Sequence, residues 1–185
     1  SHSIALCILP QTLEIFLNRF PKITPRFFLG KTPLVKAWIE SGAVEFGITV
    51  DDGKLNDFER KPIRNGKFVL TSHHALKAKT ASFLLTEERP ETLFFRRAFR
   101  AKYKTDPKVV MEVDSWEVQA RLASLKLGIA YIPDFVLNQD RQKSLHIVNL
   151  GLPNFHYELC SISLKGQSLS RNAKLFLDLM PIAQG

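Results

Sequence analysis

The feature that most constrains the fold is an alternation along the chain between short apolar runs and amphipathic helix patterns. Residues 26–29 and 43–50 have strand character, and the apolar residues of the segment 32–42 between them are spaced as on one face of a helix. A strand, a helix and a strand over so short a stretch predict a βαβ unit, with parallel strands and a right-handed crossover. A second such unit runs from KVVMEV at 108–113 to IAYI at 129–132. The alternation predicts an α/β fold with two halves.

The rest of the chain supplies further elements of both kinds. We expect helices over residues 13–20, from Pro90 to Tyr103 and from Ser168 or Ser170 onward, and strands at 58–63, 67–72, 82–86, 145–150 and 156–164. Pro10 either lies in the first turns of the first helix or separates two short helices. No linker rich in Pro, Gly or Ser separates the halves. The two lobes are therefore expected to be joined by strands that cross between them near residues 69–72 and 160–163.

Helix ends are marked by particular residues. Thr32 is the expected N-cap of the second helix, with Pro33 at its first helical position. Gly42 and Gly128 are expected to end helices. Ser115 is expected to cap the helix that follows strand 108–113.

Composition excludes several classes of protein. Hydrophobic residues make up 45% of the 185 residues, which is enough for a packed core and excludes wholesale disorder. No apolar run reaches the roughly 20 residues that a membrane-spanning helix needs, and no signal peptide is visible at the start. Cys7 and Cys160 each lie in an apolar stretch. We expect both to be buried thiols in a reducing compartment rather than a disulfide.

The net charge of +8 matters only if the basic residues cluster. The one dense cluster lies between Arg96 and Lys104, in the segment FFRRAFRAKYK. This segment fits an amphipathic surface helix with Phe94, Ala98 and Phe99 as its core stripe. The alternative is a helix that binds nucleic acid or a membrane surface.

Motifs for catalysis, nucleotides and metals are absent from the sequence. It has no G-x-G-x-x-G after a strand, no P-loop, no G-x-S-x-G, no C-x-x-C and no H-E-x-x-H. His73 and His74 are neighbours that would point to opposite faces of a strand, which makes them a poor metal pair. The carboxylate pairs Asp51-Asp52 and Glu87-Glu88 fit solvated turns better than acid–base chemistry. We therefore expect neither an enzyme nor a metal or cofactor site.

Hydroxyl residues stand at several helix starts. Ser3, Thr32 and Ser115 each begin a predicted helix, and Thr86 ends a strand just before the helix at Pro90. A helix start exposes unpaired N–H groups and carries partial positive charge, so several starts that meet at strand ends would bind a small anionic group. The alternative is that each hydroxyl is an ordinary N-cap that contributes about 1 kcal/mol to folding.

Motifs spread over the whole chain resemble one family. They are Ser3 with Pro10, Leu13, Phe16 and Phe20-Pro21; GKTPL at 30–34 with Gly42 and FGI at 46–48; TSHHAL at 71–76; EVDS at 112–115; and LGIAYIP at 127–133. In this order they resemble the effector-binding domain of LysR-type transcriptional regulators. Glu45 stands where the family usually has Asp, and Lys126-Leu127 replaces a Gly-x pair. The segment between Leu76 and Phe83 is short for the family.

The resemblance implies a two-lobed fold of the type 2 periplasmic-binding-protein kind, with lobe I at residues 1–69 and 164–185 and lobe II at 70–163. The family usually opens with a strand, and we expect this chain to start just past it. The winged helix-turn-helix that reads DNA is not in the sequence, so we expect the chain by itself to sense an effector rather than to bind an operator.

The resemblance also implies a binding site for a small effector in the cleft between the lobes. The residues onto which it maps are Ser3, Ile4, Thr32, Pro33, Thr49, Thr86, Glu87, Asp114 and Ser115, with Ser1 nearby. We expect an anionic effector. The acidic residues Glu87, Glu88 and Asp114 suggest that it also carries a cation, as an amino acid does; alternatively, they stabilise helix starts.

The implied partners are the effector, a second copy of the chain in a dimer or tetramer, and DNA only through the missing N-terminal domain. No membrane partner is expected, and the expected location is the cytoplasm. Closure of the lobes would be relayed through outer helices at 9–20 and 117–125. Three alternatives remain open at this point: a solute-binding protein of a transporter with the same fold, an enzyme on this fold, and a nucleic-acid-binding module.

Overall fold

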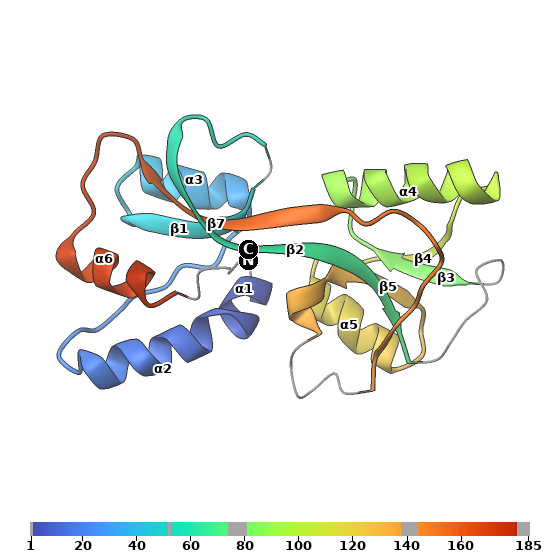
Figure 1. Ribbon diagram of the computed structural model, residues 1–185, viewed down its shortest axis with the longest axis horizontal. Helices are drawn as coiled ribbons and strands as arrows, with labels where there is room; N and C mark the ends of the chain where they lie inside the picture. Colours follow the sequence, from blue (N-terminus) through green and yellow to red (C-terminus); the bar gives the residue numbers. More distant parts are fainter. Residues whose placement is uncertain (1, 52, 74–80, 138–143, 181–185) are drawn as a thin grey trace. The chain divides into compact units, whose positions relative to one another are not determined.

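A computed structural model describes residues 2–51, 53–73, 81–137 and 144–180 of the chain. The chain divides into two compact units, one of residues 1–65 with 157–185 and the other of residues 66–156. Two long strands, β2 (Phe58–Ser72) and β7 (His156–Leu164), run from one unit into the other (Figure 1). The division falls after residue 65 in β2 and after residue 156 in β7.

The first unit is built around β1 (Phe46–Val50). This strand pairs antiparallel with β7, from Phe46 opposite Ser163 to Val50 opposite Leu159. The helices of the unit are α1 (His2–Cys7), α2 (Leu9–Arg19), α3 (Thr32–Glu40) and α6 (Arg171–Asp178). Figure 1 shows α3 and α6 on opposite sides of β1. Val35 and Ile39 of α3 form a buried cluster with Cys160 and Ile162 of β7.

The second unit has a mixed sheet between two helices. Its elements are β3 (Ser82–Leu85), α4 (Pro90–Tyr103), β4 (Lys108–Glu112), α5 (Trp116–Ser124), β5 (Ile129–Pro133), the 3-10 helix η2 (Asp134–Val136) and β6 (His146–Ile147). Strand β3 is parallel to both β4 and β5, whereas β2 is antiparallel to β5 and β6. Helices α4 and α5 lie on opposite faces of this sheet (Figure 1).

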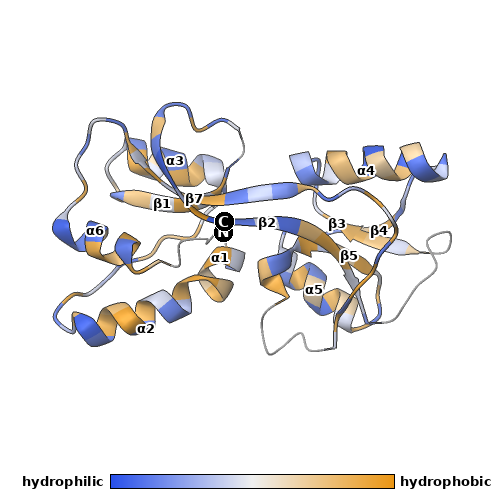
Figure 2. Cartoon of the chain, in the orientation of Figure 1, coloured by the Kyte–Doolittle hydropathy of each residue, from blue (hydrophilic) through white to orange (hydrophobic). Residues whose placement is uncertain are grey.

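The core of the second unit is apolar and aromatic. Phe83, Leu84 and Leu85 of β3 are completely buried, and β3 and β5 are largely apolar in Figure 2. The ring of Phe83 lies 5.1 Å from that of Phe95 and 5.4 Å from that of Phe99, both on α4. Each such side chain contributes about 1.5–3 kcal/mol when it is removed from water.

Most predicted elements are confirmed. The predicted strand 156–164 is β7, the predicted helix from Pro90 to Tyr103 is α4, and Pro10 lies in the first turn of α2, separate from the short α1. Ser115 and Ser170 cap α5 and α6, because each side chain accepts a hydrogen bond from the N–H three residues later. The expectation of an α/β fold is confirmed as well.

The predicted strand at residues 26–29 is wrong. The segment is not hydrogen-bonded into any sheet within the described residues, and Phe27, Phe28 and Leu29 are nearly half exposed. A strand needs a partner for its backbone groups, and in the described structure β1 is paired only with β7. The first predicted βαβ unit is therefore absent from the described structure. In the second unit β4 and β5 are both parallel to β3, which lies between them.

Several predicted boundaries also need correction. Thr32 is the first residue of α3 rather than its N-cap, which is Lys31. Gly42 follows α3 with a positive φ of 71°, as expected, but α5 is ended by Lys126 with φ 66° rather than by Gly128. Gly128 is needed instead for packing, since a Cβ there would lie 3.0 Å from the carbonyl oxygen of Ser82.

Other differences concern strand length and burial. The strands predicted at 58–63 and 67–72 are one continuous β2, and the strand predicted at 145–150 is the two-residue β6. Cys160 is buried as expected, whereas Cys7 is only half-buried. On α4 the buried core residues are Phe95 and Phe99, and Phe94 is half-buried. The proline expected to end the last helix, Pro181, lies outside the described residues.

Candidate functional site

The first unit brings two of the predicted hydroxyl residues together. Thr32 begins α3 and Thr49 lies in β1, and their Oγ1 atoms are 2.6 Å apart. Thr49 is 3% exposed, and its hydroxyl is placed to donate either to the Thr32 oxygen or to the carbonyl of Val50 at 3.2 Å. The Thr49 hydrogen bond holds the Thr32 hydroxyl at the start of α3, where the helix carries partial positive charge.

The position of this pair depends on Gly47. Gly47 and Thr49 face the same side of β1, where α3 packs. A Cβ at Gly47 would lie 2.3 Å from Val35 Cγ1 and 3.3 Å from Ile39 Cδ1. The missing side chain therefore allows α3 to lie directly on β1, which brings Thr32 within reach of Thr49.

The backbone donors at the start of α3 are fewer than we expected. Pro33 occupies the second helical position and has no N–H. The N–H of Leu34 already donates to the carbonyl of Lys31 at 3.0 Å. An anion at this helix start would therefore interact mainly with the Thr32 hydroxyl and with the field of the helix.

The remaining predicted residues of the first unit differ in exposure. Ser3 and Ile4 lie in the first turn of α1 and are each 2% exposed. Pro33 is exposed. The side chain of Ile4 lines an apolar cavity of the same unit.

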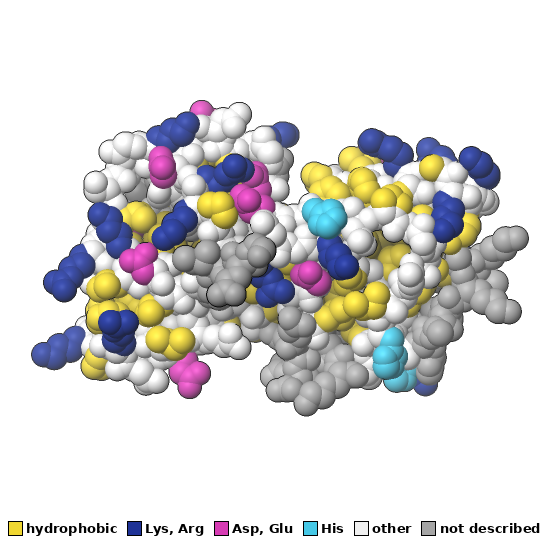
Figure 3. Space-filling model, in the orientation of Figure 1, with side chains coloured by type: hydrophobic (Ala, Val, Ile, Leu, Met, Phe, Trp, Pro, Cys, Tyr) yellow, Lys and Arg dark blue, Asp and Glu magenta, His cyan; other side chains and the backbone are white. Residues whose placement is uncertain are grey.

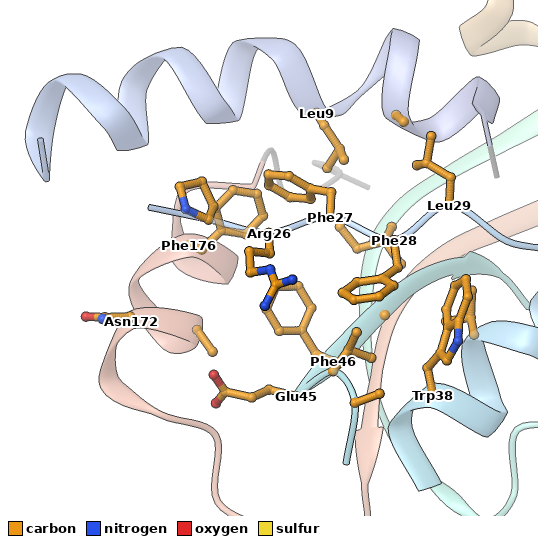
Figure 4. Close-up of a pocket in the computed structure, with 18 of the residues that line it drawn as sticks. Leu9, Arg26, Phe27, Phe28, Leu29, Trp38, Glu45, Phe46, Asn172 and Phe176 are labelled. Atoms are coloured by element: carbon orange, nitrogen blue, oxygen red, sulfur yellow. The ribbon is translucent and has the colours of Figure 1, made fainter. Parts of the chain in front are cut away.

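That cavity has a volume of about 450 Å³ and lies between the segment 23–29, β1, α2 and α6. Figure 4 shows its aromatic lining, which includes Phe27, Phe28, Phe46 and Phe176. Glu45 lies at its polar side, but its carboxylate caps α6 by accepting hydrogen bonds from the N–H and hydroxyl of Ser170 at 2.8 and 3.0 Å. Neither Thr32 nor Thr49 lines this cavity, so it is distinct from the predicted hydroxyl site.

In the second unit, predicted residues lie at the ends of β3 and β4. Thr86 follows β3 and is 1% exposed, and its Oγ1 lies 2.6 Å from that of Thr92 in the first turn of α4. Glu87 is exposed, and its carbonyl accepts a hydrogen bond from the Arg89 N–H at 2.7 Å. Thr86 thus joins the end of a strand to the start of a helix.

Asp114 and Ser115, which follow β4, already have partners within the unit. The Asp114 carboxylate forms an ion pair with Arg89, whose guanidinium lies 5.7 Å from the centre of the Trp116 ring. The Ser115 hydroxyl accepts from the Val118 N–H and donates to the Glu117 carboxylate at 2.9 Å. These contacts stabilise the start of α5, as the cap interpretation predicts.

Four buried side chains of the second unit that carry polar atoms were not predicted from the sequence: Glu91, Trp116, Gln119 and Tyr131. Burial raises the pKa of Glu91, and its own backbone N–H and Arg89 lower it in part. Burial and the nearby Glu91 carboxylate raise the pKa of Tyr131. Glu91 follows Pro90 in a first helical turn, where acidic residues are common. Nothing in the sequence therefore distinguishes Glu91 from a glutamate that is exposed to solvent.

Comparison with known proteins gives the family. A family model described as the LysR substrate binding domain matches residues 1–181. The chain belongs to this family. No curated protein matches the sequence.

Solved structures share the fold of this LysR substrate-binding domain. The cofactor-binding domain of the Cbl transcriptional regulator is 17% identical with a TM-score of 0.80, and the match covers 97% of this chain and 84% of that one. The Synechocystis PCC6803 CcmR regulatory domain in complex with 2-PG is 17% identical (TM-score 0.74; 93% and 89% covered). The effector-binding domain of QuiR in complex with shikimate is also 17% identical (TM-score 0.73; 96% and 90% covered). These matches confirm the predicted type 2 fold. The family match favours the substrate-binding domain of a LysR regulator over a transporter's solute-binding protein.

The basic segment of this LysR domain is an amphipathic surface helix. Lys and Arg side chains lie along α4 in Figure 3, while Phe95 and Phe99 face the core. Arg100 pairs with Asp106, and the Lys102 ammonium donates to the carbonyls of Leu150 and Gly151 at 2.8 and 2.9 Å. Part of the basic charge therefore supports the fold.

The other carboxylate and histidine candidates of the sequence are described only in part. Asp51 accepts a hydrogen bond from the Gly53 N–H at 2.8 Å and pairs with Arg60, as a turn residue would, and Asp52 lies outside the described residues. Over the described ranges no three His, Cys, Asp or Glu residues are grouped as a metal site, and His74 is not among those residues. Within the same ranges no helix is long and apolar enough to cross a membrane.

Proposed function

We propose that this LysR substrate-binding domain senses a small anionic or zwitterionic effector and that each unit contributes residues to binding it. Two domains of the same fold were solved with small molecules bound, 2-PG and shikimate. The residues we propose are Ser3, Ile4, Thr32, Pro33 and Thr49 in the first unit and Thr86, Glu87, Asp114 and Ser115 in the second. The observation that carries the proposal is the hydroxyl pair of Thr32 and Thr49 at the start of α3.

The pair is suited to an anion for a physical reason. The single proton of the Thr49 hydroxyl goes either to the Val50 carbonyl or to the Thr32 oxygen. When it goes to the Thr32 oxygen, the Thr32 proton is available to a ligand oxygen. The start of α3 adds a favourable field for negative charge. A hydrogen bond to a charged group contributes about 1.5–3 kcal/mol, so the Thr32 hydroxyl is expected to contribute at least tenfold to affinity.

The proposed response is a shift between conformations of the two units, relayed to a partner copy in a dimer or tetramer. An effector shifts such an equilibrium only by its difference in affinity for the two states. A shift from 1:99 to 99:1 needs about 5.5 kcal/mol. DNA would be contacted by a separate domain in the cytoplasm, and the effector would leave the site chemically unchanged.

A ligand screen tests the proposed site. Small carboxylic acids and amino acids are screened by thermal shift against the wild type, and each hit is titrated by calorimetry against Thr32→Ala, Thr49→Val and Thr105→Ala. Thr105 is an exposed threonine at the far end of α4 and serves as the matched control. We expect both site variants to weaken binding about tenfold or more and the control to bind normally. Equal affinity for Thr32→Ala and the wild type would show that the site is elsewhere.

A further inference from the structure

Unsatisfied polar atoms are concentrated at two helix starts of the second unit. Over the described residues, five buried side-chain oxygen or nitrogen atoms have no hydrogen-bond partner. Four of them belong to the first turns of α4 and α5: Glu91 Oε1, Trp116 Nε1, Glu117 Oε1 and Gln119 Oε1. The fifth, on Glu158, lies in β7, 3.9 Å from an Arg60 nitrogen.

The two helix starts lie at the same edge of the sheet. Strands β3 and β4 are parallel, with Leu85 opposite Glu112, so the helices that follow them both begin at this edge of the sheet. Arg89, just before α4, pairs with Asp114, just before α5, and its guanidinium lies over the ring of Trp116. The Gln119 side-chain amide donates to the Val113 carbonyl at 2.9 Å and so fastens α5 to the end of β4.

The unsatisfied atoms are well buried. Glu91 and Trp116 are each 7% exposed and Gln119 is fully buried. A buried polar group without a partner costs about 1–3 kcal/mol. Native proteins pair nearly all such groups with protein atoms or with bound water, so several together at one sheet edge mark a place where a bound molecule can supply the missing partners.

The donor or acceptor character of the four atoms indicates which chemical group could pair with them. Three of the four atoms are oxygens that accept hydrogen bonds, and the fourth is an indole N–H that donates one. Arg89 is already paired with Asp114, so the edge has no evident place for a second anionic group. A hydroxyl group both donates and accepts, whereas an ammonium only donates. A hydroxyl also suits the Glu91 carboxyl in either protonation state, and burial favours the neutral one by raising its pKa.

We propose that the edge formed by the starts of α4 and α5 recognises hydroxyl groups of the effector through the Glu91 carboxyl and the Trp116 indole N–H. This inference rests on the proposed function and adds to it that the effector is a hydroxylated acid. Glu91 and Trp116 are then specificity-determining residues.

Matched acids test the preference. Propionate, lactate and alanine form one set that differs by a hydroxyl or an amino group, and cyclohexanecarboxylate and quinate form a second, larger set. Each acid is titrated by calorimetry against the wild type, Glu91→Gln, Trp116→Phe and the control Glu14→Gln, which changes an exposed carboxylate of α2. We expect the wild type and the control to prefer the hydroxylated member of a set about tenfold or more. Glu91→Gln and Trp116→Phe should reduce that preference while keeping their affinity for the unsubstituted acid.

The outcomes separate the two proposals. A preference for the amino acid, or a hydroxyl preference that Glu91→Gln and Trp116→Phe leave intact, would overturn the inference but not the proposed function. Absence of binding by every acid would contradict the proposed function itself. A variant that loses all acids equally and also unfolds at lower temperature would show a structural role for its side chain and would likewise overturn the inference.

Discussion

At the scale of single residues, the same side chain can serve the fold or the site, and hydrogen-bond partners distinguish the two. Ser115 has both its donor and its acceptor capacity occupied within α5. Thr32 instead has a partner in another element, Thr49, although the sequence had indicated a cap. Thr32 is therefore a stronger candidate than Ser115 for contact with a ligand.

The Thr49 hydroxyl is expected to act through Thr32. In Thr49→Val the shape of the side chain is kept but the Thr32 hydroxyl loses its partner, which costs about 1 kcal/mol of unfolding free energy. Effector affinity should fall as well, because Thr32 is no longer held. Thr49→Ser keeps the hydroxyl and should bind the effector normally. Urea unfolding and calorimetry of both variants provide the measurements, and equal affinity for Val and Ser at this position would contradict the role of the hydroxyl.

The raised pKa of Glu91 predicts a pH dependence of stability. Burial, the largest cause, raises the pKa of this carboxyl above its ordinary value of 4.5 in the folded chain. Above that ordinary value the unfolded chain releases the proton while the folded chain still holds it. Stability should therefore fall as the pH rises from 4.5 through the folded pKa. Arg89 and Tyr131 are the other titratable groups beside Glu91.

Urea unfolding of the wild type and Glu91→Gln across this pH range measures the effect. The variant lacks the titrating group, so it should gain stability relative to the wild type as the pH rises. Glu88→Gln, an exposed change nearby, should follow the wild type. Parallel curves for the wild type and Glu91→Gln would contradict the raised pKa.

Residue types could be predicted from the sequence better than residue partners. A serine before an amphipathic stretch predicted the caps at Ser115 and Ser170 because capping is a local interaction. The sequence could not predict that Thr32 meets Thr49, since that contact depends on how α3 packs on β1. It also could not separate the buried Glu91 from the exposed Glu87 and Glu88.

At the scale of elements, the apolar pattern of the sequence predicted whether a segment is a helix or a strand more reliably than it predicted which strands pair. The apolar run at 26–29 has strand composition, but its backbone has no partner strand in the described part of the chain. The composition of a segment depends on that segment alone, whereas a strand also needs a partner strand. The partner cannot be predicted from the sequence of the segment itself. The division of a single β2 into two predicted strands has a different cause, because the turn-forming Asn65-Gly66 pair lies within a continuous strand.

The pairing of β1 predicts an alternation in amide exchange. The Asp51 N–H donates to the Glu158 carbonyl at 2.8 Å. In an antiparallel pair the backbone groups of alternate residues point toward the partner strand. The N–H groups of Gly47 and Thr49 therefore point toward β7, while those of Ile48 and Val50 point away from it. Hydrogen exchange followed by NMR should therefore be slow at Gly47 and Thr49 and fast at Ile48 and Val50. Equal protection of all four amides would show that the second edge of β1 is also covered.

The packing of α3 on β1 can be tested at Gly47. In Gly47→Ala the new methyl group would overlap Val35, and overpacking of this kind costs about 1–3 kcal/mol. Because α3 must shift, Thr32 should move away from Thr49, and effector affinity should fall together with the melting temperature. The double variant Gly47→Ala with Val35→Ala makes room for the methyl group and should recover affinity. Failure of the double variant to recover it would contradict a role for this close approach.

At the scale of the whole molecule, the order of weak motifs along the sequence made the family evident. The residues at which the chain divides into two units were less evident from the sequence. Lobe boundaries at 69 and 164 were expected, and the compact units divide after residues 65 and 156. The difference arises because β2 and β7 are continuous strands. Alternation of apolar residues runs through a continuous strand without marking where one compact unit ends.

The proposed use of both units gives the last prediction. A ligand that contacts only one unit should slow amide exchange only there, because protection follows the local stability that binding adds. An effector bound as we propose should protect the start of α3 near Thr32 and also the starts of α4 and α5 near Glu91 and Trp116. Exchange mass spectrometry with and without a saturating hit measures both regions in one experiment. In Glu91→Gln, protection near Thr32 should persist while protection in the second unit weakens. Protection restricted to the first unit in the wild type would mean that the second unit does not contact the effector.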